Sequence, residues 1–459
     1  MAQDSCQVLI IGAGPGGYVC GIRAAQLGLD TIVVEAETPG GTCLNVGCIP
    51  SKALIHAAEE FHKAVGFKGD NPLGIEVGSP SIDLAKTMAW KDGIVSRLTR
   101  GVSGLLQKAG AQTVQGKARI LDGKTVQVDT PDGPRRIKAD NLVIASGARP
   151  QSLPDLPFGN KVISSTEALA LTSVPSSLAV VGGGYIGLEI GTAFAKLGSE
   201  VTVIEARPRL LPQYDAALTA PILSRLRALG VTIHLNANAK GMSKDNAVMF
   251  VELPEGELQL PADKVLLTIG RAPVLDGFGL ETLHLSMAGR YLKIDDLCAT
   301  SMRGVYAIGD VTGEPMLAHR AMAQGMIVAE HIAGLSSIWD KRTIPAVCFT
   351  DPEIVAVGAL PGDVQGAQVA QFPFAGNGRS MTLERSDGFV RVVFDPTNEL
   401  ILGLQVVGAG VSEMASGFAL ALEMGATLTD IGHTVHAHPT LGEALQESAL
   451  KGLGQALHI

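Results

Sequence analysis

The chain has 459 residues, of which 46% are hydrophobic and 55 are glycine, and its formal net charge is -9. A chain of this length supports roughly three domains, each with its own core. The acidic balance, without any block of lysine and arginine, excludes the electrostatic signature of a nucleic-acid-binding or membrane-surface protein. The first residues show neither a basic leader nor a long apolar one, so we expect a cytoplasmic protein. In that reducing compartment the six cysteines do not form a disulfide framework.

The first predicted element is a short apolar strand that leads into a glycine-rich turn and a helix. It reads QVLIIGAGPGG over residues 7–17. Gly12 permits a tight turn, Gly14 lets the backbone approach a pyrophosphate, and Gly17 permits close helix packing. A second strand follows and ends at Glu35, whose carboxylate can accept hydrogen bonds from an adenosine ribose. The pattern predicts a dinucleotide-binding unit.

Two of the six cysteines lie close together in the glycine-rich stretch GGTCLNVGCIPSK. Four residues separate Cys43 from Cys48, so the pair can close an intrachain disulfide. Pro50 marks the expected start of a helix, which places Cys48 at the positive helix end, where the pKa of a thiol is lowered. Zinc is disfavoured because no second cysteine pair or histidine pair accompanies this one, and we expect no metal. The stretch therefore predicts a redox-active dithiol.

The glycine pattern recurs in SLAVVGGGYIGLEIGTAFAKLGSEVTVIEA. Its three glycines have the spacing of the first copy: Gly182, Gly184 and Gly187. In both copies an acidic residue follows the last glycine by 18 residues, and here it is Glu205. Two such units imply one tightly bound and one exchangeable dinucleotide, for which flavin and nicotinamide are the natural pair. Glu205 favours NAD because a carboxylate repels the 2′-phosphate of NADP, although Arg207 and Arg209 follow it and leave some NADP use open.

The C-terminal part contains the histidine-rich segment HTVHAHPTLGEALQE. Dithiol chemistry needs a group that takes and returns protons, and histidine suits this at neutral pH. Three histidines of the segment are candidates: His433, His436 and His438. We favour His438, because Pro439 can fix its backbone and Glu443 can orient its ring.

Together these motifs resemble the pyridine nucleotide-disulfide oxidoreductase family over essentially the whole chain. GGTCLNVGCIPSK is similar to the redox-active motif of the family, and its CIPSK ending has the lipoamide-type form. By this resemblance Cys43 is the thiol that exchanges with substrate, and Cys48 is the thiol that contacts the flavin. HAHPTLGE is similar to the C-terminal catalytic signature. The resemblance therefore implies that His438 is the acid and base, that Glu443 is its partner, and that both come from the other subunit of a homodimer.

The resemblance extends to residues around two cofactors, FAD and NAD. NLVIASGARP is similar to the segment where the chain leaves the flavin domain, with Ser146 where threonine is commoner, and GVYAIGDV is similar to the second flavin motif, in which Asp310 bonds the ribityl chain. Tyr185 is placed like the aromatic residue that covers the nicotinamide face of the flavin. Glu189 is placed like the carboxylate that pairs with Lys52 near the reactive flavin nitrogen. Cofactor contacts are implied at three further positions: Gly147, Gly270 and Ala318.

The implied fold is α/β, with two Rossmann-like domains and a C-terminal α+β dimerisation domain. The expected limits are 1–148 for the FAD domain, 149–270 for the NAD domain, 271–344 for a return to the FAD or central domain, and 345–459 for the interface domain. The implied activity is the NAD-dependent oxidation of dihydrolipoyl groups. The implied partners are the lipoyl domains of a 2-oxo acid dehydrogenase complex or of the glycine cleavage system. Two alternatives are a glutathione-type disulfide reductase and a non-catalytic structural subunit that binds flavin and NAD.

Overall fold

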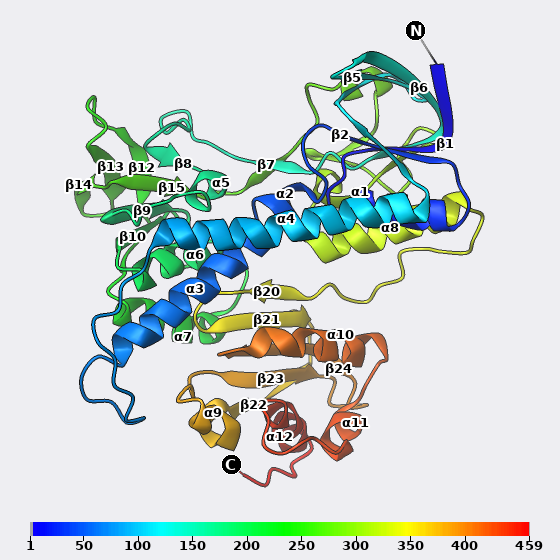
Figure 1. The fold of residues 1–459 in the computed structure, drawn as a ribbon. Helices are drawn as coiled ribbons and strands as arrows, with labels where there is room; N and C mark the ends of the chain where they lie inside the picture. Colours follow the sequence, from blue (N-terminus) through cyan, green and yellow to red (C-terminus); the bar gives the residue numbers. More distant parts are fainter. Residues whose placement is uncertain (1–2, 459) are drawn as a thin grey trace.

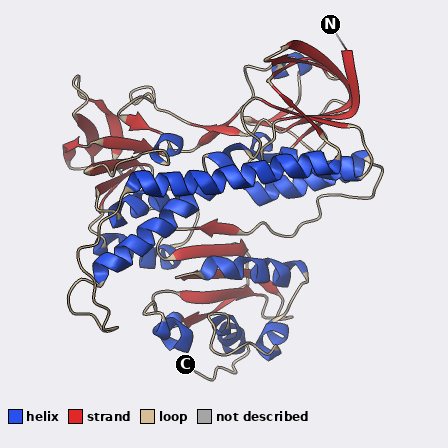
Figure 2. Ribbon diagram, viewed as in Figure 1, coloured by secondary structure: helices blue, strands red, loops and turns tan. Residues whose placement is uncertain are grey.

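The computed structural model describes residues 3–458. Three main sheets are arranged around a layer of helices (Figures 1 and 2). The N-terminal sheet lies at the upper right of Figure 1, the second sheet at the upper left and the C-terminal sheet below them. Among the described residues, no helix combines the length and the apolar character needed to cross a bilayer.

The N-terminal sheet has seven strands in the order β3-β2-β1-β6-β5-β4, with β19 also paired to β6. Its strands are β1 (Gln3–Ile11), β2 (Thr31–Glu35), β3 (Gln112–Gln115), β4 (Lys117–Asp122), β5 (Thr125–Thr130), β6 (Gly133–Ile144) and β19 (Val305–Ala307). The long strand β6 pairs antiparallel with β5 through its first half and parallel with β19 through its end. The parallel strands β1, β2, β6 and β19 thus end at one edge of the sheet, where ligands bind in sheets of this kind.

The turn between β1 and helix α1 (Pro15–Gln26) is built on two glycines. Gly12 has a φ of 100°, and a Cβ at this residue would lie 2.4 Å from the carbonyl oxygen of Ala145. A Cβ on Gly17 would lie 1.8 Å from the carbonyl oxygen of Gly12. Only glycine fits either position, because neither leaves room for a Cβ, and L side chains rarely adopt the φ of Gly12. The helix therefore starts directly above the end of β1 and packs against α8 (Ala318–Ile332).

The second sheet is a parallel sheet with the order β11-β10-β9-β15-β8. Its strands are β8 (Val162–Ile163), β9 (Ser177–Val181), β10 (Glu200–Glu205), β11 (Thr232–Leu235) and β15 (Lys264–Leu267). Helix α6 (Tyr185–Lys196) follows β9 as α1 follows β1. A three-stranded antiparallel sheet covers it with β12 (Asn238–Met242), β13 (Val248–Leu253) and β14 (Gly256–Pro261). The chain enters and leaves this region through the paired strands β7 (Ala148–Pro150) and β16 (Arg271–Pro273).

The two cysteines lie at the start of a long helical excursion. Helix α2 (Gly41–Asn45) carries Cys43, and α3 (Cys48–Gly66) begins at Cys48, two residues before Pro50. The helix thus starts earlier than the proline predicted, because proline lacks only an N–H that the first helical turn leaves unpaired in any case. The chain returns through α4 (Leu84–Ala109), which crosses the middle of the molecule (Figure 1).

The C-terminal sheet is antiparallel, with the order β20-β21-β24-β23-β22. Its strands are β20 (Ala346–Cys348), β21 (Glu353–Gly358), β22 (Gln368–Pro373), β23 (Phe389–Phe394) and β24 (Ile401–Gly408). The strands β23 and β24 read FVRVVF and ILGLQVVG. Helices α10 (Ala415–Glu423), α11 (Leu428–His433) and α12 (Glu443–Gly452) follow the sheet. A separate apolar core lies between these helices and the sheet.

Short elements complete the fold. They are β17 (Met287–Ala288), β18 (Tyr291–Leu292), α5 (Ser165–Ala168), α7 (Ala216–Ala228), α9 (Gly378–Thr382), and the 3-10 turns η1 (Leu280–Leu283), η2 (Gly309–Thr312), η3 (Phe374–Gly376) and η4 (Val411–Met414). Of these, η2 matters most for the site, because it follows β19 at the carboxyl edge of the N-terminal sheet.

Candidate active site

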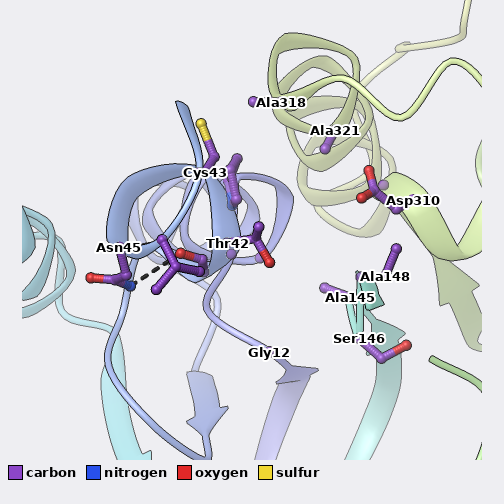
Figure 3. A pocket seen from close by; sticks show the side chains of 18 of the residues that line it. Gly12, Thr42, Cys43, Asn45, Ala145, Ser146, Ala148, Asp310, Ala318 and Ala321 are labelled. Carbon is purple, nitrogen blue, oxygen red and sulfur yellow. Dashed lines mark hydrogen bonds between the residues drawn. The ribbon is translucent and has the colours of Figure 1, made fainter. Parts of the chain in front are cut away.

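One cavity of about 580 Å³ gathers most of the residues singled out in the sequence. It is lined by Gly12, Gly14, Gly17, Glu35, Cys43, Cys48, Lys52, Ser146, Gly147, Tyr185, Glu189, Asp310 and Ala318. Figure 3 shows Cys43 on one wall and Asp310 with Ala318 on the facing wall. The predicted residues outside it are Gly182, Gly184, Gly187, Glu205, Gly270, His438 and Glu443. A cavity of this volume has the size of a cofactor site.

The part of the cavity formed by the first glycine turn is shaped for a dinucleotide. Gly14 is the N-cap of α1, so the free N–H groups of the first helical turn face the cavity and suit a pyrophosphate. Glu35 ends β2 and accepts hydrogen bonds from the backbone N–H of Ala13 at 2.7 Å and of Glu37 at 2.9 Å. These bonds hold the carboxylate beside the turn, where it can accept further bonds from ribose hydroxyls.

Asp310, the second residue of η2, also lines the cavity. Burial raises the pKa of its carboxyl group, and this group receives no hydrogen bond from the residues 3–458 that the structure describes. A half-buried carboxyl group on a cavity wall that has no hydrogen-bond donor within the chain indicates that a ligand supplies one. The hydroxyl groups of a ribityl chain provide such donors. The glycine turn and Asp310, which line the same cavity, therefore fit FAD.

Ser146 and its neighbours mark the crossing between the sheets. The Ser146 hydroxyl donates to the carbonyl oxygen of Val274 at 2.8 Å, and Gly147, with a φ of 71°, accepts from the Val274 N–H at 3.0 Å. Gly270 has a φ of 126° and accepts from the Gln151 N–H at 3.1 Å. Ser146 and Gly147 line the cavity, whereas Gly270 lies at the β15-to-β16 turn outside it.

Cys43 and Cys48 are free thiols in this structure, and they hydrogen-bond to each other. The loop between them is tight, since a Cβ on Gly47 would lie 2.8 Å from the carbonyl oxygen of Thr42. Asn45 fixes this loop from both sides. Its side-chain amide donates to the carbonyl oxygen of Gly41 at 3.1 Å, and its oxygen accepts from the hydroxyl of Thr99 on α4 at 3.0 Å.

The two thiols differ in acidity. The hydrogen bond from Cys43, together with the charge of Lys52, lowers the pKa of Cys48 to about 7. The same hydrogen bond and burial raise the pKa of Cys43. The position of Cys48 at the first residue of α3 acts in the same direction, because the helix N-terminus favours a thiolate. Cys48 is therefore the thiol that ionises first, close to neutral pH, while Cys43 stays protonated.

Lys52 lies one turn after Cys48 on α3 and forms an ion pair with Glu189 on α6. The Lys52 Nζ lies 2.8 Å from Glu189 Oε2. Phe349 completes the arrangement, because its backbone N–H donates to Glu189 Oε1 at 2.9 Å and its ring lies 4.3 Å from Lys52 Nζ. The structure thus brings together the pair expected from the family resemblance and adds a contact from the C-terminal sheet region.

The second glycine fingerprint repeats the first in detail. Glu205 is 8% exposed, and it accepts from the backbone N–H of Gly183 at 2.6 Å and of Arg207 at 2.8 Å. Gly184 is the N-cap of α6, and no atom lies within 4 Å of the place where its Cβ would be. A second dinucleotide can approach this open turn. Arg207 is exposed, and Arg209 donates to the carbonyl oxygen of Pro212 at 2.7 Å.

His438 and Glu443 form a pair in the C-terminal domain. His438 Nδ1 lies 2.8 Å from Glu443 Oε1, and the Thr440 N–H donates to Glu443 Oε2 at 2.8 Å. Burial opposes ionisation of Glu443, but these two bonds hold the pKa of its carboxyl group below the ordinary value. The His438 side chain is 79% exposed, and neither residue lines the cavity of its own chain. The other two histidines lack a carboxylate partner within the described chain; His436 contacts only the Thr434 carbonyl oxygen at 2.9 Å.

Sequence reasoning did not single out Asn45 or Phe349. Asn45 stands between the two cysteines, and its place inside the motif was an available signal. Phe349 contacts Glu189 through its backbone N–H and Lys52 through its ring. No local pattern marks such a residue, because its role depends on the packing of distant segments.

A dithiol at a helix N-terminus, on a cavity shaped for one dinucleotide and beside a second dinucleotide-binding turn, defines a flavoprotein disulfide oxidoreductase. Comparison with known proteins supports the same class. The sequence family described as "Pyridine nucleotide-disulphide oxidoreductase" matches residues 6–325, and its dimerisation domain matches residues 344–449. The chain belongs to the pyridine nucleotide-disulphide oxidoreductase family.

Individual relatives cover nearly the whole chain. A dihydrolipoyl dehydrogenase from Pseudomonas aeruginosa is 57% identical over 98% of both chains. One from Geobacillus stearothermophilus is 43% identical over 99% of this chain and 97% of its own. Among solved structures, LpdA from Mycobacterium tuberculosis matches with a TM-score of 0.88 and 28% identity, covering 97% of this chain and 99% of that one. The protein is an enzyme that uses FAD and NAD, with an α/β fold and a dimerisation domain.

Proposed function

We propose that this enzyme oxidises dihydrolipoyl groups to lipoyl groups and reduces NAD, with Cys43 and Cys48 as its redox dithiol. The observation that carries the proposal is the position of this dithiol on the cavity shaped for FAD, beside the ion pair of Lys52 and Glu189. The relatives named dihydrolipoyl dehydrogenase support the choice of substrate. Glu205 supports NAD, because its carboxylate would repel a 2′-phosphate at the second turn.

The chain's own groups account for the thiol exchange. In the oxidised enzyme Cys43 and Cys48 form a disulfide. A dihydrolipoyl thiol loses its proton to His438 of the partner subunit, and the resulting thiolate attacks the sulfur of Cys43. The disulfide bond breaks, and Cys48 leaves as a thiolate that Lys52 and the N-terminus of α3 stabilise. Glu443 keeps the Nδ1 proton of His438 in place, so that Nε2 faces the substrate.

A second exchange completes the half-reaction. The remaining thiol of the substrate attacks its own mixed-disulfide sulfur and closes the lipoyl ring. Cys43 leaves and takes the proton that His438 holds, and His438 takes the proton of the attacking thiol. The substrate has then lost two electrons and two protons; the enzyme holds the electron pair on its dithiol, one proton on Cys43 and one on His438. FAD, when bound, supplies the two-electron transfer from this dithiol to NAD. The chain would hold it with the Gly12 to Gly17 turn, Glu35 and Asp310.

The remaining assignments belong to the same proposal. The site is shared across a homodimer, which the exposure of His438 and its absence from the lining of its own chain's cavity support. The domain limits are those expected from the sequence, at 148, 270 and 344. The physiological donors are lipoyl domains of a 2-oxo acid dehydrogenase complex or of the glycine cleavage system, and the compartment is the cytoplasm.

A steady-state assay of the purified yellow protein tests the proposal. Dihydrolipoamide is offered with NAD and with NADP, and glutathione disulfide is offered with NADPH. Of these three combinations, we expect rapid turnover only with dihydrolipoamide and NAD, which should yield NADH. Cys43→Ser should abolish it, whereas the matched variant Cys6→Ser, a buried cysteine away from the cavity, should retain it. Activity only with NADPH and glutathione disulfide would indicate a glutathione-type reductase. A folded, flavin-bound dimer without any turnover would indicate a structural subunit.

A further inference from the structure

Helices α3 and α6 pack side by side and are joined by ion pairs at two levels. At their N-terminal ends Lys52 of α3 pairs with Glu189 of α6. Seven residues further along each helix, Glu59 of α3 pairs with Lys196 of α6. Seven residues are two helical turns, so the second pair lies directly below the first with its charges exchanged between the helices.

One segment of the C-terminal region, residues 349–351, contacts both pairs. Phe349 donates its backbone N–H to Glu189, as described above. Two residues later, Asp351 Oδ2 lies 2.7 Å from Lys196 Nζ and 2.9 Å from Arg225 Nε on α7. Its other oxygen accepts from Arg385 Nη2. The lower pair is therefore the centre of a cluster that joins α3, α6 and α7 to the C-terminal domain.

The lower cluster is the more buried of the two. The side chains of Lys196 and Asp351 are 4% and 10% exposed, whereas Lys52 is 31% exposed. Burial opposes ionisation of Asp351, but Lys196 and Arg385 hold the pKa of its carboxyl group well below the ordinary value. A buried ion cluster contributes little net stability compared with apolar packing, but it accepts only one geometry. Such a cluster is suited to fixing the spacing of two helices.

The upper ends of the two helices form a wall of the cavity. The first two turns of α3 carry Cys48 and Lys52, and the first two turns of α6 carry Tyr185 and Glu189. The spacing of α3 and α6 therefore sets the position of the Cys48 sulfur relative to Tyr185, the residue expected to cover the nicotinamide face of the flavin. Because Lys52 is partly exposed, the upper pair by itself restrains this spacing weakly.

We infer that Lys196 is a positioning residue for the reaction, which acts by fixing the separation of α3 and α6 through Glu59 and Asp351. The inference rests on the proposed function. Lys196 touches neither the cavity nor the dithiol. It acts through the two helices, whose first turns present the reacting thiol and the residues around the bound flavin.

The test compares variants of the intact FAD-containing enzyme. In Lys196→Met, two carboxylates of the cluster lose their shared cation, and the helices move apart. We expect kcat for NAD reduction to fall on the order of tenfold, with the KM for dihydrolipoamide unchanged. The long-wavelength absorption of the two-electron-reduced enzyme, which reports contact of the Cys48 thiolate with flavin, should weaken. Lys196→Arg should leave kcat and the absorption band near their wild-type values, because it keeps the buried cation. Glu59→Gln is a milder change, and it should also lower kcat and weaken the absorption band.

Arg391→Met is the matched control. Arg391 is 4% exposed and joins β23 to Asp215, the N-cap of α7, and to Gln405 at 2.9 Å, without touching α3 or α6. It should lower thermal stability while leaving the absorption band and kcat unchanged. Unchanged band and kcat in Glu59→Gln and Lys196→Met, or equal effects in Arg391→Met, would overturn the inference. If the wild-type enzyme fails to oxidise dihydrolipoamide while Lys196→Met still weakens the band, the proposed function fails and the positioning role stands.

Discussion

His438 Nδ1 lies 2.8 Å from Glu443 Oε1, and yet neither residue lines the cavity that holds Cys43 and Cys48 in the same chain. The chain therefore carries a histidine oriented by a carboxylate on one domain and the two neighbouring cysteines on another. A two-fold dimer can join them, because each subunit presents both surfaces to its partner.

Glu443→Gln removes the charged partner that orients the His438 ring. We expect kcat to fall on the order of a hundredfold, while the dimer and the bound flavin persist. Steady-state kinetics measure the fall in kcat. His436→Gln is the control, and a loss of similar size in it would show that the effect is not specific to the pair.

Cys43 donates the hydrogen bond that lowers the pKa of Cys48 to about 7. Cys43→Ala removes this donor, so the pKa of the Cys48 thiol should rise and less thiolate should be present at neutral pH. Cys43→Ser keeps a donor, so its titration should stay nearer to that of the reduced wild-type enzyme. Ultraviolet absorbance of the thiolate, followed against pH, measures this directly. Equal midpoints in the alanine and serine variants would contradict the assignment of the hydrogen bond.

Asp351 links stability to pH. Its pKa is lower in the folded protein than in the unfolded chain, so its stabilisation is present above the unfolded value of about 4 and is lost as pH falls further, through the folded value. Asp351→Asn should cost about 3–5 kcal/mol at pH 7 because it leaves buried cations unpaired. It should also flatten the loss of stability below about pH 4. Thermal unfolding across pH measures this. Asp276→Asn, in an exposed pair with Arg149, should change stability little, and equal effects would contradict the account.

Glu205 holds the second glycine turn through the N–H groups of Gly183 and Arg207. Glu205→Gln keeps an acceptor there but removes the charge that repels a 2′-phosphate. We expect the ratio of kcat/KM for NADP to that for NAD to rise on the order of tenfold. The exposed Arg207 provides the cation that the phosphate would meet, so adding Arg207→Ala should reverse the gain. An unchanged ratio in Glu205→Gln would show that this carboxylate does not select the nucleotide.

The sequence predicted those parts of the site whose residues are close together in the chain. Both glycine turns, the placement of Cys48 at a helix start and the contact of His438 with Glu443 depend on short, fixed spacings, and the structure shows each arrangement. The cluster around Lys196 was not predicted, because its partners come from separate helices and from the C-terminal region. No periodicity records such contacts, since they arise only when the domains pack together. The predicted start of α3 at Pro50 was wrong by two residues, because the first turn of a helix tolerates proline and α3 begins at Cys48.

The most direct test of the account is activity in hybrid dimers made from two inactive variants, Cys48→Ser and His438→Gln. In a hybrid, one site combines both lesions and the other combines the intact dithiol of one subunit with the intact histidine of its partner. Random reassociation should therefore restore about a quarter of the wild-type rate of dihydrolipoamide oxidation by NAD. Restoration to this level would show that each site uses Cys48 of one subunit and His438 of the partner subunit. Hybrids that form and remain inactive would contradict the shared site, and with it the proposed mechanism.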